Sequence, residues 1–322
     1  LTISFSAVKK AVSIAHKYFR KRLLPSSAED LLKETVADAA QNGKELVSAE
    51  DVIAIAQRKI NVPLHAVGQK EATSLLNLEE TIHQKLVDQE EAVGAVSRAL
   101  REYRSGLSRK GGPIASFLFV GPTGVGKTEL SKILAEIQFG SKDALVRFDM
   151  SEYQDKQSFF RLIGTPDGSI SGQLTDAIRE KPYSLVLLYE FEKAYSDVLN
   201  LFLQVFDDGR LTDNLGRVVD FSNSILIATS NAHSLFIKEE IEKGRTISQI
   251  APELKKKLTD VYRPELLNRF SDIIVFKSLS LSDIENIARL NLKELAKTVE
   301  TAQGISLNFD VSAVRAIAQL VF

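Results

Sequence analysis

Eight residues from Gly121 to Thr128 have the types and spacing of a phosphate-binding loop. They read Gly-Pro-Thr-Gly-Val-Gly-Lys-Thr and lie between an apolar run at 116–120 and a helical pattern that continues to Ala135. Glycines let the backbone curl so that successive N–H groups point at phosphate oxygens, and the helix that follows presents its positive end to the same anion. Such a string can occur by accident in a loop, but the strand-like run before it and the helix after it favour nucleotide binding.

The residues of this loop have distinct predicted roles. Lys127 would reach the β- and γ-phosphates of a nucleotide, and the Thr128 hydroxyl would ligate Mg²⁺. The positions predicted to contact the nucleotide are Pro122, Thr123, Gly124, Val125, Gly126, Lys127, Thr128 and Glu129.

A second set of reactive side chains follows the apolar run 185–188. Proteins that hydrolyse nucleotides on such a loop usually end a central strand in an acidic pair, an Asp that holds Mg²⁺ and a Glu that polarises the attacking water. Glu190 stands in the Glu position and is predicted to be the general base; the alternative is a solvated carboxylate at a strand end. Tyr189 stands in the Asp position, where a neutral phenol does not replace a carboxylate beside a hard cation. Metal affinity and hydrolysis rate should both fall unless Thr128 and the phosphates suffice.

Two further residues follow or precede predicted strands. Asn231 ends the run Thr-Ser-Asn after the fourth strand, where its amide could orient the water and sense the γ-phosphate; the alternative is an ordinary turn. Arg269 precedes the fifth strand and could cross to the γ-phosphate of a neighbouring subunit, because a planar guanidinium stabilises the charge that develops in phosphoryl transfer. Taken alone, Arg269 is more simply interpreted as a surface ion-pair partner.

The composition is that of an ordinary globular protein and disfavours several classes of function. The 322 residues suggest about two domains. A net charge of -1 gives no overall field toward nucleic acid or an anionic membrane, and the absence of cysteine excludes disulfides and thiolate chemistry. The four histidines lack metal-ligand spacing. No stretch approaches a membrane span and no secretory signal opens the chain, so we expect a cytoplasmic protein without membrane contact.

Hydrophobic periodicity predicts helices in the first third of the chain. Helical patterns at 6–19, at 28–40 and after Ser48 predict a small helical domain, and 69–77 is polar enough to be a linker. Two more helices are expected at 78–86 and 90–104, before glycines break the pattern.

From residue 113 the period changes to short β-rich runs separated by helical stretches. The expected strands are 117–120, 144–148, 184–189, 224–229 and 273–276. This alternation predicts an α/β fold with a five-stranded parallel sheet between helices, and a ligand at the carboxyl ends of the strands. After residue 279, a helix at 281–299, a strand at Ile305–Phe309 and a helix from Val311 predict a second small domain. Because the chain opens at Leu1 and stops within that last helix, we expect it to be part of a longer protein.

The motifs together resemble the Clp family of AAA+ unfoldases and disaggregases, and specifically the second of their two ATPase modules. The segments that carry the resemblance are 117–130, 147–153, 161–164, 190–194, 203–213 and 263–269. Leu24-Pro-Ser-Ser-Ala-Glu-Asp30 resembles a characteristic helix in the small domain of the family's first module. The resemblance divides the chain into that small domain (1–68), a linker with leading helices (69–112), the P-loop ATPase domain (113–278) and an incomplete C-terminal small domain (279–322).

The resemblance also implies ligands and partners. Family members form hexameric rings that thread polypeptide through a central channel at the expense of ATP, so ATP or ADP, Mg²⁺ and protein substrates are the expected ligands. Leu86 and Val87 would lie against adenine, Asn231 would sense the γ-phosphate, and Arg269 would be the arginine finger. A peptidase ring is a further partner if the chain belongs to the protease-associated branch.

Several positions depart from the family pattern. Besides Tyr189, the segment Gly164–Gln173 is shorter than the family's aromatic pore loop and lacks its substrate-gripping Tyr, which questions threading by this module. No coiled-coil insertion interrupts the first small domain, as in protease-associated members, yet no docking loop for a peptidase follows Asn231. The branch of the family therefore stays open.

Three hypotheses follow from these observations. The leading one is an ATP-dependent protein-remodelling module. The second is a hydrolysis-impaired scaffold whose bound nucleotide stabilises a ring, motivated by Tyr189 and the altered pore loop. The third, a motor that acts on nucleic acid, is disfavoured by the balanced charge and by the lack of a basic path with interspersed aromatic residues.

Overall fold

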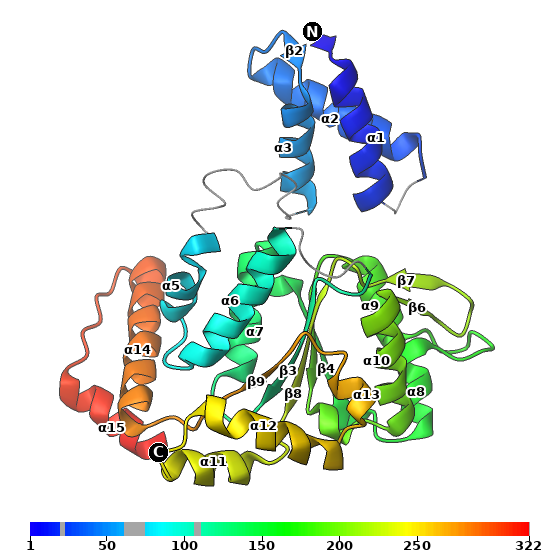
Figure 1. The fold of residues 1–322 in the computed structure, drawn as a ribbon. Coiled ribbons are helices and arrows are strands. Elements are labelled where there is room, and N and C mark those ends of the chain that lie inside the picture. Colours follow the sequence, from blue (N-terminus) through cyan, green and yellow to red (C-terminus); the bar gives the residue numbers. More distant parts are fainter. Residues whose placement is uncertain (20–22, 61–74, 106–110, 322) are drawn as a thin grey trace. The chain divides into compact units, whose positions relative to one another are not determined.

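The computed structural model describes residues 1–19, 23–60, 75–105 and 111–321 (Figure 1). The chain divides into two compact units, Leu1–Ala72 with Glu136–Ser141, and Thr73–Ala135 with Lys142–Phe322. The boundary expected after residue 68 lies outside the described residues.

Three helices build the first unit. They are α1 (Phe5–Tyr18), α2 (Ser26–Gln41) and α3 (Ala49–Ile60), and a short parallel pair joins β1 (Thr2–Ile3) to β2 (Leu46–Val47). The Ser4 side chain caps α1 by accepting a hydrogen bond from the Ala7 N–H, which satisfies one of the free donors of the first turn. Apolar side chains of all three helices form one buried cluster, so this unit has its own core.

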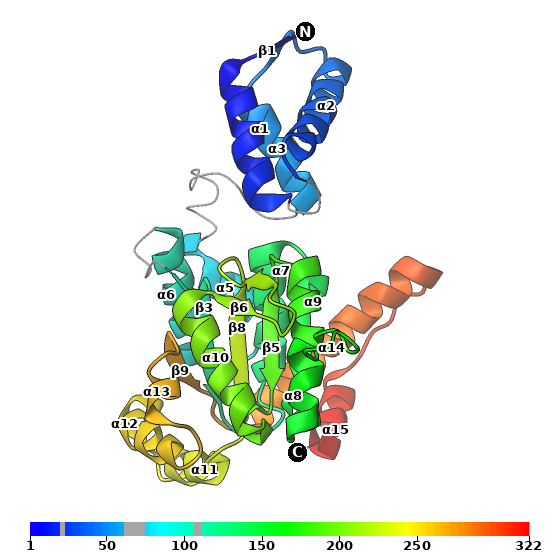
Figure 2. The ribbon, with the colours of Figure 1, turned by 90° about the vertical axis from the view of Figure 1, so that its right-hand side faces the viewer.

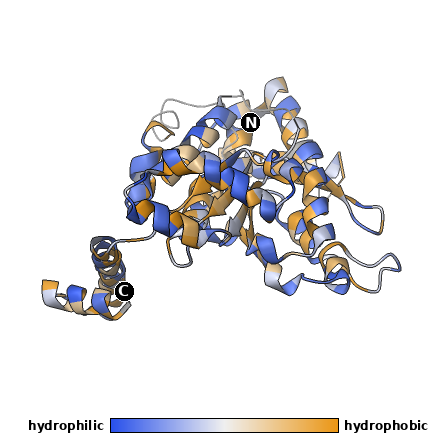
Figure 3. Cartoon of the chain, turned by 60° about the horizontal axis from the view of Figure 1, so that its bottom comes forward, coloured by the Kyte–Doolittle hydropathy of each residue, from blue (hydrophilic) through white to orange (hydrophobic). Residues whose placement is uncertain are grey.

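The second unit is built around a five-stranded parallel sheet in the order β4-β5-β8-β3-β9, which confirms the predicted sheet. The strands are β3 (Ala115–Val120), β4 (Leu145–Asp149), β5 (Leu185–Tyr189), β8 (Ile225–Ser230) and β9 (Asp272–Val275). The strands β3 and β8 are buried along their whole length, because helices cover both faces of a parallel sheet. In Figure 3 the hydrophobic colour gathers in the middle of the second unit, and the helices around it show mixed colours along their length.

Helices cover the two faces of the sheet in two groups (Figures 1 and 2). One group contains α6 (Glu90–Arg104), preceded by α5 (Leu78–His83), and α7 (Lys127–Phe139). The other contains α8 (Lys156–Ile163), α9 (Gln173–Glu180), α10 (Ser196–Asp208) and α12 (Ile247–Lys257), whose side chains share a buried apolar cluster with Leu118, Val186, Leu188, Leu226 and Ala228. Because side chains alternate along a strand, Phe119, Tyr189 and Thr229 point to the face of α6 and α7.

The remaining elements lie outside the sheet. They are an antiparallel hairpin of β6 (Arg210–Thr212) and β7 (Val218–Asp220), the helices α11 (Ser234–Glu242) and α13 (Pro264–Leu267), and a pair of packed helices, α14 (Leu281–Gln303) and α15 (Val311–Val321). The strand expected at Ile305–Phe309 is wrong: these residues form neither helix nor strand. A strand needs a neighbour that completes its hydrogen bonds, and no described segment pairs with this one. Within the described residues, no helix is long and apolar enough to cross a membrane.

Candidate nucleotide-binding site

The predicted phosphate loop joins the buried strand β3 to the first turn of α7. Gly124 and Gly126 have φ of +81° and +104°, a left-handed region that glycine enters without strain, so the backbone curls as the sequence predicts. Gly121 lies so close to the backbone of Phe276 that a side chain does not fit, because a Cβ there would lie 2.5 Å from the Phe276 carbonyl oxygen. Thr123 and Gly124 are exposed at the tip of the loop.

The Lys127 side chain lies inside this loop and donates three hydrogen bonds. Its Nζ is 2.5 Å from the Gly121 carbonyl oxygen, 2.7 Å from that of Pro122 and 2.9 Å from Oδ1 of Asn231. Burial lowers the pKa of Lys127 to about 8, against the opposite effect of the nearby Glu192 and Glu190 carboxylates. The ammonium thus bonds to carbonyl oxygens of its own loop, and phosphate oxygens can take over the same donors.

The chain turns sharply after β5 to place Glu190. This residue has φ of +54° in the left-handed region, where a residue other than glycine is strained, and such strain is concentrated at functional sites. Its backbone N–H donates to Oγ1 of Thr229 at 3.2 Å, which ties the turn to the neighbouring strand β8. The Glu190 carboxylate accepts a hydrogen bond from Nδ2 of Asn231 at 3.4 Å.

Asn231 therefore lies between the loop lysine and the candidate base. Its amide oxygen accepts from Lys127 and its amide nitrogen donates to Glu190, so the three predicted side chains form one hydrogen-bonded line. They come from the ends of β3, β8 and β5, which are neighbours in the sheet.

Sequence reasoning missed Glu192 as a part of this site. Its Oε1 accepts a hydrogen bond from the Asn231 backbone N–H at 3.0 Å. Its Oε2 is buried without a hydrogen-bond partner among the described residues. The available signal was the second acidic residue of the run Glu190-Phe-Glu-Lys-Ala194.

The residues predicted to hold Mg²⁺ fit that ion poorly. Thr128 is half-buried in the first turn of α7 and offers one hydroxyl. Tyr189 ends β5 beneath the Arg147 guanidinium, 4.3 Å from ring centre to guanidinium carbon. No group of three or more His, Cys, Asp or Glu side chains in the described part of the chain could hold a metal ion. A protein-built cage of carboxylates is thus absent there, and Mg²⁺ would depend on Thr128 and the phosphates.

The predicted adenine contacts lie beside the loop. Leu86 is buried, and a Cβ at Gly126 would lie 3.1 Å from its Cδ1, so the leucine packs directly against the phosphate loop. Gln89 holds the same region in place by donating to the carbonyl oxygens of Val125, at 3.3 Å, and Lys277, at 3.0 Å. Val87 is half-buried next to Leu86. Pro122 and Glu129 are half-buried, and Glu129 pairs with Lys132 at 3.0 Å.

Arg269 is not part of this cluster. Its backbone carbonyl accepts a hydrogen bond from Oγ of Ser116, at the amino end of β3, whereas the phosphate loop follows the carboxyl end. Its guanidinium pairs with Asp207, with 3.1 Å between Nε and Oδ1, and its side chain is partly exposed. The structure thus separates Arg269 from Lys127 by the length of the sheet.

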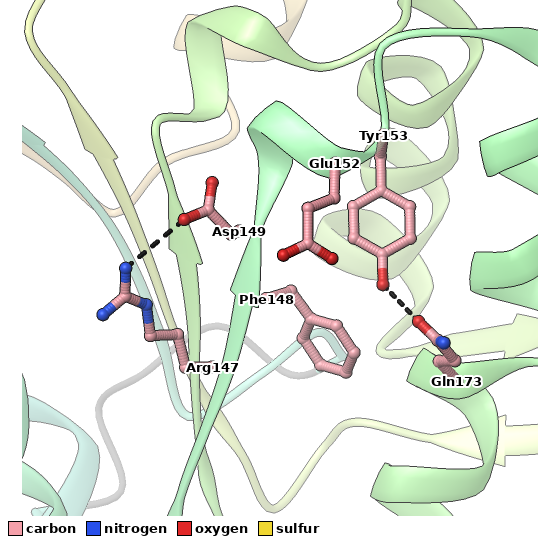
Figure 4. A pocket seen from close by; sticks show the side chains of 6 residues that line it. All are labelled: Arg147, Phe148, Asp149, Glu152, Tyr153 and Gln173. Carbon is pink, nitrogen blue, oxygen red and sulfur yellow. Dashed lines mark hydrogen bonds and ion pairs between the residues drawn. The ribbon is translucent and has the colours of Figure 1, made fainter.

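An open pocket of about 480 Å³ lies at the carboxyl end of β4 (Figure 4). Its lining residues are Arg147, Phe148, Asp149, Glu152, Tyr153 and Gln173. Arg147 pairs with Asp149 on one side, and on the other the Tyr153 hydroxyl donates to the Gln173 amide oxygen. Burial raises the pKa of Tyr153. Sequence reasoning used 147–153 only as a family motif and assigned it no chemistry.

The parallel sheet and the loop with its inward-turned lysine define a P-loop nucleotide-binding domain. Residues 112–273 match the model of the AAA domain (Cdc48 subfamily), and residues 1–93 match that of an AAA lid domain. The chain belongs to the AAA domain family.

Two relatives of this chain are Clp proteins, which confirms the resemblance to the Clp family. The chain is 45% identical over 285 residues to chaperone protein ClpB2, chloroplastic, of Oryza sativa subsp. japonica, covering 86% of this chain and 29% of that protein. It is 43% identical over 293 residues to the ATP-dependent Clp protease ATP-binding subunit ClpA homolog of Cyanidium caldarium, covering 85% of this chain and 34% of that protein. The chain thus spans about a third of the length of these relatives.

A solved structure extends this similarity to the fold. The closed-state reconstruction of Hsp104 with ATPyS and FITC casein matches with a TM-score of 0.79 and 34% identity, covering 98% of this chain and 56% of that chain.

Proposed function

We propose that this chain binds ATP at residues 121–128 and hydrolyses it as an ATPase module of a Clp-type protein-remodelling machine. The observation that carries the proposal is the hydrogen-bonded line from Lys127 through Asn231 to Glu190. It links a phosphate-binding lysine to a candidate general base across neighbouring strands, and the water that attacks a γ-phosphate must lie between that phosphate and the base.

The residues would act as follows when ATP binds. Phosphate oxygens take the Lys127 donors that the carbonyls of Gly121 and Pro122 hold now, and the N–H groups of the loop bind the same anion. The Asn231 amide, no longer bonded to Lys127, orients the attacking water, and Glu190 accepts its proton. Thr128 would be the one protein ligand of Mg²⁺ beside the phosphates, so the metal would neutralise only a small part of the phosphate charge.

Arg269 would complete the site of a neighbouring subunit. It lies at the end of the sheet away from its own phosphate loop, so it can meet a γ-phosphate only in another copy of the chain. This placement supports a ring in which each interface holds one nucleotide, and we propose the hexamer of the Clp family.

Polypeptides are the proposed substrates of the whole protein. The matched Hsp104 reconstruction contains casein, and one relative is named as the ATP-binding subunit of a protease. We therefore propose unfolded or tagged polypeptides as substrates, with a peptidase ring as a candidate partner and no role for nucleic acid or membrane. A cytoplasmic location is part of the same proposal.

A second candidate function is a hydrolysis-impaired scaffold whose nucleotide stabilises the ring. The observation that favours it is Tyr189, which lies under Arg147 where a metal-holding carboxylate is expected. Nucleotide binding then persists while turnover is slow or absent.

Steady-state ATP hydrolysis at increasing protein concentration separates the two functions. The measurement compares the natural chain with Tyr189→Asp and Glu190→Gln, with binding of fluorescent ADP followed in parallel. Turnover in the natural chain that Glu190→Gln abolishes supports the motor. Binding without turnover until Tyr189→Asp restores it supports the scaffold, and failure to bind adenine nucleotide rejects both.

A further inference from the structure

A stacked pair of an aromatic ring and a cation occupies the carboxyl end of β5, where the sequence pattern leads one to expect a carboxylate. The Arg147 guanidinium carbon lies 4.3 Å from the centre of the Tyr189 ring. Arg147 also pairs with Asp149, with 3.4 Å between Nη2 and Oδ2, and Asp149 is the register partner of Tyr189. Two neighbouring strands thus hold the Arg147 guanidinium, paired with Asp149, over the phenol ring.

Side-chain alternation places this pair on the face of the sheet that α7 covers. Val186 and Leu188 point into the apolar cluster under α8, α9 and α10, so Tyr189 points to the opposite face. The first turn of α7 carries Lys127 and Thr128, the residues predicted to meet the phosphates and the metal. The stacked pair and the predicted metal position therefore share one face and one end of the sheet.

A divalent cation at that position lacks favourable partners. Mg²⁺ prefers hard anionic oxygens, whereas Tyr189 supplies a phenol. The Arg147 guanidinium, half-exposed and paired with Asp149, adds a positive charge beside the ring that a second cation would meet.

The nearby carboxylates have other partners. Asp149 pairs with Arg147 and accepts hydrogen bonds from the backbone N–H and the hydroxyl of Ser151. Glu190 accepts a hydrogen bond from the Asn231 side chain, and Glu192 accepts one from the Asn231 backbone. Both also lie close enough to Lys127 to stabilise its charged form. Their negative charge thus acts on the lysine, which itself binds phosphate.

We propose that this site binds adenine nucleotide with little dependence on a divalent cation. Lys127, the N–H groups of the loop and the amino end of α7 balance the phosphate charge, while the Tyr189–Arg147 pair keeps the contribution of the metal small. This inference rests on the proposed nucleotide binding but not on hydrolysis.

Fluorescence titration with a fluorescent ADP, in excess Mg²⁺ and in excess EDTA, tests the inference. For the natural chain, removing Mg²⁺ should change the dissociation constant by less than about threefold. For Tyr189→Asp, which places a carboxylate beside Arg147, binding in Mg²⁺ should become about tenfold or more tighter than binding in EDTA. Tyr189→Phe keeps the ring without adding a carboxylate, so it should behave as the natural chain does.

Each outcome has a defined meaning. A natural chain that loses tenfold or more in affinity when Mg²⁺ is removed overturns the inference and leaves the proposed function intact. A folded Tyr189→Asp chain without a metal response shows that Tyr189 is not the cause. Absence of binding in both conditions refutes the inference together with nucleotide binding itself. If Tyr189→Asp does not fold, the natural chain and Tyr189→Phe still decide the question.

Discussion

At the scale of single residues, Asn231 connects the phosphate loop to the candidate base. Its amide oxygen accepts from Lys127 and its amide nitrogen donates to Glu190, so a movement of Lys127 that breaks its bond to Asn231 frees one end of the amide. The backbone of Asn231 stays fixed by Glu192 during that change. Nucleotide binding at the phosphate loop can therefore change the hydrogen bond to Glu190 through the rotation of the Asn231 side chain.

Nucleotide binding should take up protons at pH 8. Burial lowers the pKa of Lys127 to about 8 in the free chain, and a bound phosphate raises it again by stabilising the ammonium. Roughly half a proton per nucleotide should therefore be absorbed at pH 8, where the phosphates themselves are already ionised. Calorimetry in two buffers of different ionisation enthalpy measures this uptake. Lys132→Ala, which removes a half-buried lysine that pairs with Glu129 in the same helix, should leave it unchanged. Uptake that is absent at pH 8 contradicts the role of Lys127.

The same lowered pKa has a consequence for stability with a defined sign. The unfolded chain keeps Lys127 protonated up to about 10.5, whereas the folded chain releases the proton near pH 8. The unfolded state therefore binds more protons between these values, and the contribution of Lys127 to the free energy of unfolding rises with pH across that window. Below pH 8 the buried charge lowers stability.

Removing the Glu192 carboxylate should destabilise the fold. Glu192→Ala leaves the Asn231 N–H without its charged acceptor, and the lost hydrogen bond should lower the free energy of unfolding by about 1–3 kcal/mol. Glu192→Gln retains an amide oxygen that can accept the same bond, so it should cost less. Urea unfolding measures both, with Glu239→Ala on the exposed side of α11 as a neutral reference. Equal losses for Ala and Gln would show that the hydrogen bond is unimportant.

At the scale of secondary-structure elements, Phe276, the residue directly after β9, confines the phosphate loop. A Cβ at Gly121 would meet the Phe276 carbonyl oxygen at 2.5 Å and the Phe276 Cβ at 2.9 Å. Gly121→Ala should therefore push β9 and the loop apart and lower the free energy of unfolding by about 1–3 kcal/mol. Gly94→Ala is the matched control, because this glycine lies within α6 and its new Cβ would meet only the Arg98 side chain, at 4.0 Å.

Thermal or urea unfolding of the two glycine variants gives opposite expected signs. Alanine in the middle of a helix is favoured over glycine by up to about 1 kcal/mol, so Gly94→Ala should be as stable as the natural chain or more so. A Gly121→Ala chain of unchanged stability and unchanged nucleotide affinity would mean that the contact with Phe276 is not restrictive.

The strands were predictable because buried strands have recognisably apolar sequences. Central strands of a parallel sheet are covered on both faces, so β3 and β8 appear as short, mainly apolar runs between turn residues. The segment Ile305–Phe309 has alternating apolar residues but no partner strand, and pairing is a property that local pattern cannot supply. The hairpin of β6 and β7 was missed because its strands have three residues each.

The candidate site was predictable to the extent that it depends on strand ends. Lys127, Glu190 and Asn231 each follow a predicted strand, and parallel strands bring such positions to one edge. The contacts of Arg147 with Tyr189 and of Arg269 with Asp207 depend on side-chain directions between segments far apart in the sequence. No local periodicity encodes such contacts.

At the scale of the whole molecule, one chain presents two parts of the proposed site at opposite ends of its sheet. The phosphate loop follows the carboxyl end of β3, and Arg269 lies near the amino end of the same strand. A head-to-tail contact between copies can bring the two parts together, and a head-to-tail contact closes into a ring when its rotation allows. Catalysis should therefore belong to the interface and not to the single chain.

Two inactive variants should restore activity to each other when mixed. Arg269→Ala retains Glu190 and lacks the finger, whereas Glu190→Gln retains Arg269 and lacks the base. In a mixed ring, an Arg269→Ala copy that is followed by a Glu190→Gln copy holds a complete site. With equal amounts and random assembly, each side of an interface holds either variant with equal chance. About a quarter of the interfaces therefore have the order that completes a site, and the mixture should show about a quarter of the hydrolysis rate of the chain that carries neither substitution.

The mixing experiment separates a finger supplied by a neighbour from one that acts within its own chain. If Arg269 served the nucleotide of its own chain, every copy in the mixture would lack one essential group and the mixture would stay inactive. Subunits are mixed before nucleotide is added, and hydrolysis is compared with each variant alone at the same total concentration. If the natural chain turns over too slowly, both variants are built on Tyr189→Asp. Arg263→Ala, which removes a nearby arginine that bonds to Asn200 at 3.1 Å, serves as the control and should not need a partner to be active.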